Sequence, residues 1–120
     1  MKNHGLPKKL LKLGLNQVQN CVVGAARVAG VIDFPVPPNS SMRKTSTGSL
    51  WGFYLAGLRT SLPIAACARR EGIPLDKKIR ILDFGCGVGR PLLHMTRTYP
   101  APEYYAWDMD HTSVEWIQKN

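Results

Sequence analysis

The 120-residue chain has little cysteine, and its cysteines lack the spacings typical of disulfide-stabilised or zinc-binding small folds. Its three cysteines, Cys21, Cys67 and Cys86, form no C-x-x-C pair and leave one thiol over. Neither a disulfide framework nor a zinc knuckle is predicted. His94 and His111 have no metal-ligating neighbour at a useful spacing, so no metal site is expected.

Long apolar runs are also missing. Within residues 1–34 the longest stretch without a charge or an amide, residues 21–26, is far short of the roughly 20 residues that a spanning helix needs. Polar residues interrupt the basic N-terminal stretch where the apolar part of an export signal would lie. We therefore expect a cytoplasmic protein, with contact to a membrane surface as the one exception considered below.

Acidic residues are nearly absent from the first half of the chain. Residues 1–60 carry eight basic residues and one acid, a net charge of +7, whereas residues 61–120 carry eight basic and seven acidic residues, a net charge of +1. Any binding to a polyanion is therefore expected in the first sixty residues. Nucleic acid is less expected as a partner than an acidic membrane surface, because these basic residues are not interleaved with stacking aromatic residues.

The first half divides into a helical segment and a linker. Apolar residues recur at steps of three and four between Leu11 and Ala29, which predicts an amphipathic helix over residues 7–29 within a basic segment, residues 1–34. This helix either packs on its own or a partner's domain or lies on an acidic membrane surface. Residues 35–49 are rich in proline, serine and threonine and predict a linker with too few large apolar residues to join a core.

From residue 50 onward the chain predicts accessory helices and then an α/β pattern. Residues 50–72 are apolar at helical spacing, but Pro63 predicts two shorter helices that meet near Ser61. Residues 78–84 and 103–107 predict strands, residues 89–99 a helix, and Asp110 or Thr112 the cap of a last helix. Strand, glycine loop, helix, strand and helix open a parallel sheet flanked by helices.

The residues most indicative of function follow the first predicted strand. Glycines at 85, 87 and 89 remove side chains where the chain leaves the strand, so that backbone amides can approach a ligand. Asp108 follows the second strand, near the offset at which a carboxylate meets ribose hydroxyls in doubly wound folds. A glycine loop with an acid at that place indicates an adenosine-binding site.

Two common adenosine cofactor motifs are absent. The dinucleotide fingerprint needs a glycine where Arg90 stands, and nothing in the chain supplies the Gly-Lys-Ser/Thr that ends a P-loop. Asp83, two residues before the first glycine, would repel a pyrophosphate and would attract an ammonium or a sulfonium group.

Leu82 to Gly89 resembles motif I of the class I S-adenosylmethionine-dependent methyltransferases, Leu-Asp-x-Gly-x-Gly-x-Gly, at every defined position. The resemblance covers residues 50–120 and implies the opening half of a Rossmann-like parallel sheet of two βα units, preceded by N-terminal helices. It implies a partial methyltransferase domain with accessory helices at 50–72 and a cofactor-binding βαβα unit at 78–120. The cofactor-binding residues it implies are Asp83, Phe84, Gly85, Cys86, Gly87, Gly89, Asp108 and Met109.

The resemblance also assigns roles to these positions. Gly85 and Gly87 would line the methionine part of S-adenosylmethionine, Asp83 would hold its amino group, Asp108 would bind both ribose hydroxyls and Met109 would border adenine. Cys86 stands at a variable position and is expected to be a small loop residue rather than a nucleophile. The family's sheet has seven strands, of which two are predicted here, so the acceptor and the catalytic residues are not assigned.

Two functions are therefore carried forward. The first is the cofactor-binding part of a methyltransferase that acts on an unknown acceptor, with no turnover expected from these 120 residues alone. The second is a non-catalytic basic module that binds an acidic membrane surface or nucleic acid through the N-terminal helix.

Overall fold

The structure, a computed structural model, describes residues 18, 21–26, 28–30, 32–45 and 49–120. The chain divides into two compact units, residues 1–34 and residues 35–120. The fold is mixed α/β, with helices before and between two parallel strands. None of the helices among the described residues combines the length and the apolar character needed to cross a membrane.

The first unit is described only in part. The helix predicted over residues 7–29 is helical at residues 18, 21–26 and 28, and its remaining positions up to residue 27 lie outside the described residues. Val18 and Val22, on the predicted apolar stripe, are both exposed. The two roles considered for this helix therefore stay predictions.

The predicted linker contains a short helix, α2 (Asn39–Thr45). Ser41 and Met42 in this helix are buried, and Met42 is among the most buried side chains of the described chain. The prediction that this segment lacks the apolar residues to join a core is therefore wrong for α2. The flexible side chain of Met42, which can fill an irregular gap, helps to anchor this short helix.

One continuous helix, α3 (Leu50–Arg70), replaces the two helices that Pro63 predicted. The buried stripe of this helix continues past the proline without a break, and the burial of that stripe offsets the roughly 3 kcal/mol that an interior proline costs. Pro63 has no N–H group to donate to the carbonyl of Arg59. Both residues are exposed, so water can donate a hydrogen bond to that carbonyl instead. The residues of the buried stripe are Leu50, Phe53, Gly57, Ser61, Ala65 and Ala68.

Both ends of α3 carry residue types that are typical of helix termini. The Ser49 hydroxyl oxygen accepts a hydrogen bond from the backbone N–H of Gly52 at 3.0 Å, which caps the N-terminus. At the other end Gly72 adopts φ 71°, and the N–H of Ile73 donates to the Ala68 carbonyl at 2.8 Å. A left-handed glycine followed by a backward hydrogen bond is the usual way for a helix to end.

The second half confirms the predicted order of strands and helices. Strand β1 (Arg80–Phe84) pairs in parallel with β2 (Glu103–Trp107), so that Arg80 lies beside Glu103 and Phe84 beside Trp107. Helix α4 (Arg90–Thr98) connects the strands, and α5 (His111–Lys119) follows β2. The N-cap of α5 is Asp110, and Thr112, the other predicted cap, lies within the helix.

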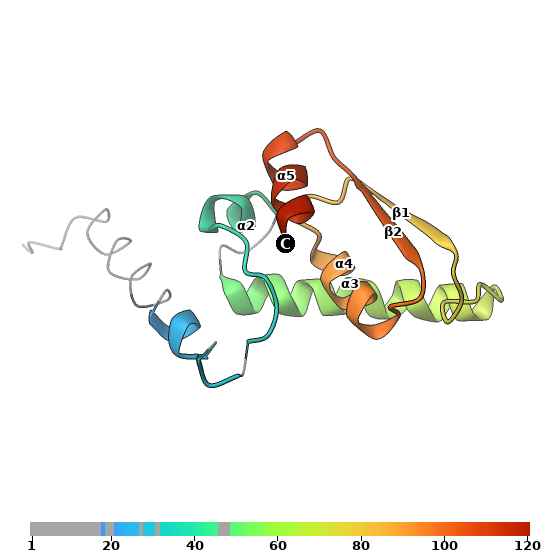
Figure 1. Ribbon diagram of the computed structural model, residues 1–120, viewed down its shortest axis with the longest axis horizontal. Helices are drawn as coiled ribbons and strands as arrows, with labels where there is room; N and C mark the ends of the chain where they lie inside the picture. The colour runs from blue at the N-terminus through green and yellow to red at the C-terminus, as the bar shows by residue number, and fades with distance from the viewer. Residues whose placement is uncertain (1–17, 19–20, 27, 31, 46–48) are drawn as a thin grey trace, which may run out of the picture. The chain divides into compact units, whose positions relative to one another are not determined.

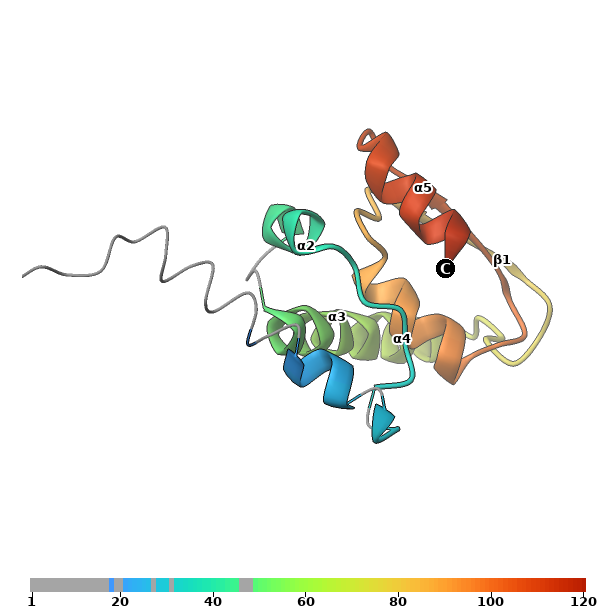
Figure 2. The same ribbon diagram turned by 60° about the vertical axis from the view of Figure 1, so that its left-hand side comes forward.

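One face of this two-stranded sheet is covered by α3 and α4, which pack side by side (Figures 1 and 2). Tyr104 lies on the covered face, and its hydroxyl lies 3.1 Å from the carbonyl oxygen of Met95 and 2.8 Å from that of Tyr99, at the end of α4. These contacts hold α4 against β2. The core on this face consists of Ala65, Ala68, Leu75 and Met95, with Ile79, Ile81, Tyr99 and Tyr104 packed around them.

A glycine sets the distance between α3 and α4. A Cβ atom at Gly57 would overlap the backbone carbonyl oxygen of Arg90 and would lie 2.9 Å from Cδ2 of His94. His94 is itself buried, with Nε2 2.9 Å from the Tyr54 carbonyl oxygen and its ring edge-on to the Tyr54 ring. The close approach of the two helices therefore depends on a position with no side chain.

Candidate functional site

The candidate site is the loop that leaves β1 and enters α4. Gly85, Gly87 and Gly89 have φ angles of 80°, 53° and 70°, a left-handed conformation that no other residue type adopts in the described chain. A Cβ at Gly85 would meet nothing within 4 Å, so glycine is needed there for its backbone angle and not for space. The predicted glycine loop between strand and helix is therefore present in the structure.

The backbone N–H groups of this loop are bonded to β2. The N–H groups of Gly85 and Cys86 both donate to the Trp107 carbonyl oxygen, at 2.8 and 3.1 Å, and the N–H of Gly87 donates to Oδ2 of Asp108 at 2.7 Å. The sequence predicts that these amides approach a ligand, but at these three positions they hold the loop against the neighbouring strand. An anionic ligand would find no free donor at these three positions, which disfavours a pyrophosphate.

Asp108 lies at the end of β2 and points toward the glycine loop. Its Oδ1 accepts a hydrogen bond from the N–H of Asp110 at 2.8 Å, in addition to the bond from Gly87 to Oδ2. These hydrogen bonds, that from Asp110 first, hold the pKa of Asp108 below its ordinary value. Each carboxylate oxygen can still accept a further bond, so a half-buried, ionised Asp108 can bind hydroxyl donors of a ligand.

Asp83 lies on β1, one residue before the end of the strand. Its Oδ2 atom is buried and has no hydrogen-bond partner among the residues that the structure describes. Burial first, and the charge of Asp108 second, raise the pKa of the Asp83 carboxyl. A buried carboxylate is costly unless a cation or a donor pairs with it, so Asp83 favours a ligand that carries a positive group.

The other predicted site residues surround these two acids in the sequence. Cys86 is buried, and burial together with Asp83 and Asp108 raises the pKa of its thiol to about 11. The thiol is therefore protonated at neutral pH, in agreement with a packing role rather than a nucleophilic one. Phe84, the last residue of β1, is 72% exposed, and Met109, two residues after β2, is 83% exposed.

Asp110 and Lys44 adjoin the site, and the sequence did not associate them with it. Oδ2 of Asp110 accepts hydrogen bonds from Lys44 Nζ at 2.9 Å and from the Ser113 hydroxyl at 2.8 Å. This contact joins α2 to the segment that carries Asp108. No local signal in the sequence could have identified Lys44, because 66 residues separate the two partners.

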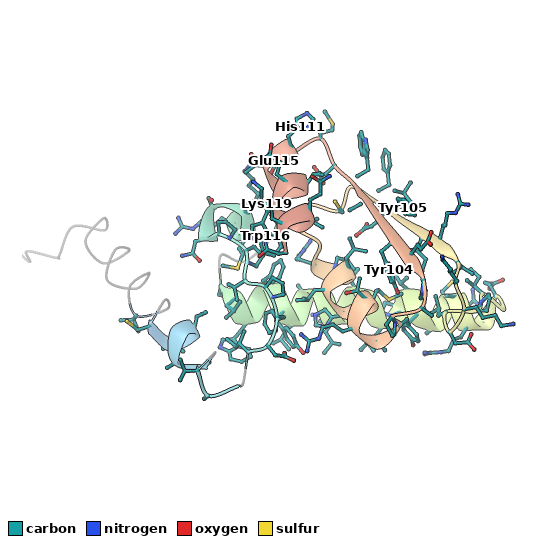
Figure 3. All side chains as sticks on the ribbon, viewed as in Figure 1. Tyr104, Tyr105, His111, Glu115, Trp116 and Lys119 are labelled. Carbon is teal, nitrogen blue, oxygen red and sulfur yellow. The ribbon has the colours of Figure 1, made fainter. Side chains whose placement is uncertain are left out.

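Within the part of the chain that the structure describes, the histidines and cysteines are not gathered into a metal centre. No group of three or more histidine, cysteine or acidic side chains within the described ranges is arranged to hold a metal ion. His94 packs between α3 and α4, and burial lowers its pKa, whereas His111 is exposed at the start of α5 (Figure 3). We find no reason to assign either histidine to the candidate site.

Comparison with known proteins adds nothing to this description. No protein-family model, no curated protein and no solved structure matches the chain. The argument for a function therefore rests on the loop and its two acids.

Proposed function

We propose that the second unit binds S-adenosylmethionine through the loop after β1, as the cofactor-binding part of a class I methyltransferase with a Rossmann-like sheet. The observation that carries the proposal is the buried Oδ2 of Asp83, which has no hydrogen-bond partner among the described residues. The loop that follows Asp83 has its amides of Gly85, Cys86 and Gly87 already bonded within the protein. A ligand with a positive group and no phosphate suits both features. S-adenosylmethionine is such a ligand and fits the resemblance of residues 82–89.

Each part of the proposed ligand has a matching residue. Asp83 would accept the ammonium group, and this ion pair would supply the partner that its buried oxygen lacks. Asp108, already held in place by Gly87 and Asp110, would accept the two ribose hydroxyls at its remaining lone pairs. Met109, exposed beside Asp108, would cover one face of the adenine.

S-adenosylmethionine supplies a methyl group on a positively charged sulfur that a nucleophile can attack in line. The role of this chain would be to bind and orient that group, which is the larger part of what such a transfer needs. The two acids also create a negative environment that favours the sulfonium form over its neutral product. No acceptor and no catalytic residue follow from the described residues.

The test is titration calorimetry on the full chain with S-adenosylmethionine, with NAD⁺ and ATP as competitors for the same site. Asp108→Asn and Asp83→Asn are each expected to weaken binding about 10- to 100-fold, the 1.5–3 kcal/mol typical of a hydrogen bond to a charged group. Asp76→Asn is the matched control, because Asp76 is exposed in the turn that precedes β1, at the opposite end of the strand.

Two results would reject the proposal. The first is equal affinity for S-adenosylmethionine in the wild type and both variants, provided that circular dichroism shows all of them folded. The second is binding of NAD⁺ or ATP as tight as that of S-adenosylmethionine, since a pyrophosphate should be repelled by Asp83.

A further inference from the structure

The face of the sheet opposite α3 and α4 is apolar and uncovered in the described part of the chain. Leu82 and Phe84 on β1 are 61% and 72% exposed, and Tyr105 and Trp107 on β2 are 50% and 47% exposed. Figure 3 shows Tyr104 and Tyr105 on opposite sides of β2. Parallel sheets normally have both faces covered, because each face is built from large apolar residues. We call these four side chains the apolar ladder.

The parallel register arranges this face in three rows. Arg80 lies beside Glu103 in the first row, Leu82 beside Tyr105 in the second, and Phe84 beside Trp107 in the third. Alternate residues of a strand share a face, so all six side chains belong to the uncovered side. The rings of Phe84 and Trp107 stack with their centroids 4.4 Å apart.

We propose that a second copy of this chain covers the apolar ladder, in a face-to-face dimer with its two-fold axis parallel to the strands. That axis places β1 of one copy over β2 of the other, so each row meets its own equivalent. Arg80 then faces Glu103 of the second copy at two symmetric places, beside the ion pair of 2.9 Å that Glu103 makes with Lys78 of its own chain. The rows of Phe84 and Trp107 from the two copies meet in the dry centre. An isologous contact needs such a self-complementary face.

The arrangement of charges selects this axis over its alternative. A two-fold axis perpendicular to the strands would place the row of Arg80 and Glu103 over the aromatic row of Phe84 and Trp107. That arrangement would remove both charges from water without an opposite charge from the second copy.

The size of the face predicts a weak dimer. The exposed fractions of the four apolar side chains leave on the order of 450 Å² per copy to be buried. Two copies would bury roughly 900 Å², below the roughly 1,200–2,000 Å² of a stable complex. Association should therefore depend on protein concentration. It should be measured at physiological salt, where a Debye length of about 8 Å screens the charge of +8 on each chain.

The first test is sedimentation velocity of the full chain from low to high micromolar concentration. We expect a monomer that converts to a dimer and to no larger species. Leu82→Gln should weaken dimerisation at least roughly tenfold, because it places an amide in the apolar centre. Leu62→Gln is the matched control, because Leu62 on α3 is 59% exposed and lies outside the ladder; it should leave the dimer unchanged.

The second test uses charge reversal and mixing. Arg80→Glu and Glu103→Arg should each abolish most of the dimer, because like charges then face each other across the axis. An equimolar mixture of the two variants should dimerise again, since each charge then meets its opposite on the other copy. The mixture leaves the like-charge pair inside each chain unchanged, so the recovery reports only on contact between copies. The double variant should dimerise like the wild type and shows that the reversals are compatible with folding.

Several outcomes would overturn the proposal. These are a chain that stays monomeric at every concentration, growth into open-ended oligomers, equal effects of Leu82→Gln and Leu62→Gln, or a mixture that does not recover. Leu82, Arg80 and Glu103 are not among the predicted cofactor-binding residues, so these variants test the dimer separately from the binding of S-adenosylmethionine.

Discussion

Substitution of Gly57 by alanine should destabilise the second unit, although alanine is the better helix former. The added Cβ would overlap the carbonyl oxygen of Arg90 and lie 3.0 Å from its carbonyl carbon and 2.9 Å from Cδ2 of His94. Two of these atoms belong to the backbone of α4, so no rotamer change relieves the contact. Helix α4 would have to move away from α3 by roughly 1 Å.

The size of the effect follows from two opposing terms. Overpacking a core costs about 1–3 kcal/mol, whereas alanine in place of glycine in a helix gains about 1 kcal/mol. Because the clash involves backbone, we expect the upper part of that range and a net loss of roughly 1–2 kcal/mol in the free energy of unfolding. A loss of 1 kcal/mol lowers the melting temperature of a domain of this size by about 4–8 °C.

The assay is urea and thermal unfolding followed by circular dichroism, at a protein concentration low enough to keep the chain monomeric. Gly24→Ala is the control, because a Cβ at Gly24 meets nothing within 4 Å and that residue is also helical. The control should be neutral or slightly stabilised. If Gly57→Ala matches the wild type or exceeds it in stability, the close contact between α3 and α4 does not exist as described.

Two further predictions concern buried titratable groups. Burial lowers the pKa of His94 from its ordinary 6.5, so the folded state holds this ring neutral. Burial of the neutral His94 ring therefore contributes its full stability above pH 6.5. That contribution is lost as the pH falls below 6.5 toward the lower pKa of the folded state. His94→Gln keeps a donor for Tyr54 and should flatten urea midpoints measured across this pH range; an unchanged slope would contradict the assignment. Cys86, with a thiol pKa raised to about 11, should react with iodoacetamide only on unfolding, whereas the exposed Cys21 and Cys67 should react in the folded chain. Mass spectrometry of the alkylated protein distinguishes the three sites, and equal rates would show that the loop does not protect its cysteine.

Short-range patterns accounted for most of the second half. The bounds of β2 were predicted to the residue from its aromatic run, and α4 was found to begin after Gly89 with Pro91 in its first turn. These signals act over a few residues, because they depend on backbone angles and on the alternation of side chains. The glycine loop was predicted for the same reason, and its three left-handed glycines confirm it.

Predictions that depended on packing were less successful. Pro63 predicted a break that the continuous buried stripe of α3 overrides, and the linker contains a helix anchored by the buried Met42. In both places, burial against distant residues outweighed the local preference. The candidate site was predicted in part: its residues were named, but the bonding of the loop amides to Trp107 and Asp108 was not.

The amino-acid order by itself determined the alternation of strands and helices, the left-handed turns at the glycines and the placement of an acid near the end of each strand. Only the tertiary structure decided that Asp108 faces the loop, that one oxygen of Asp83 is buried without a partner in the described chain, and that Leu82, Phe84, Tyr105 and Trp107 are left uncovered. The physical reason is range. Backbone preferences act between neighbours, whereas burial and pairing depend on which distant surfaces meet.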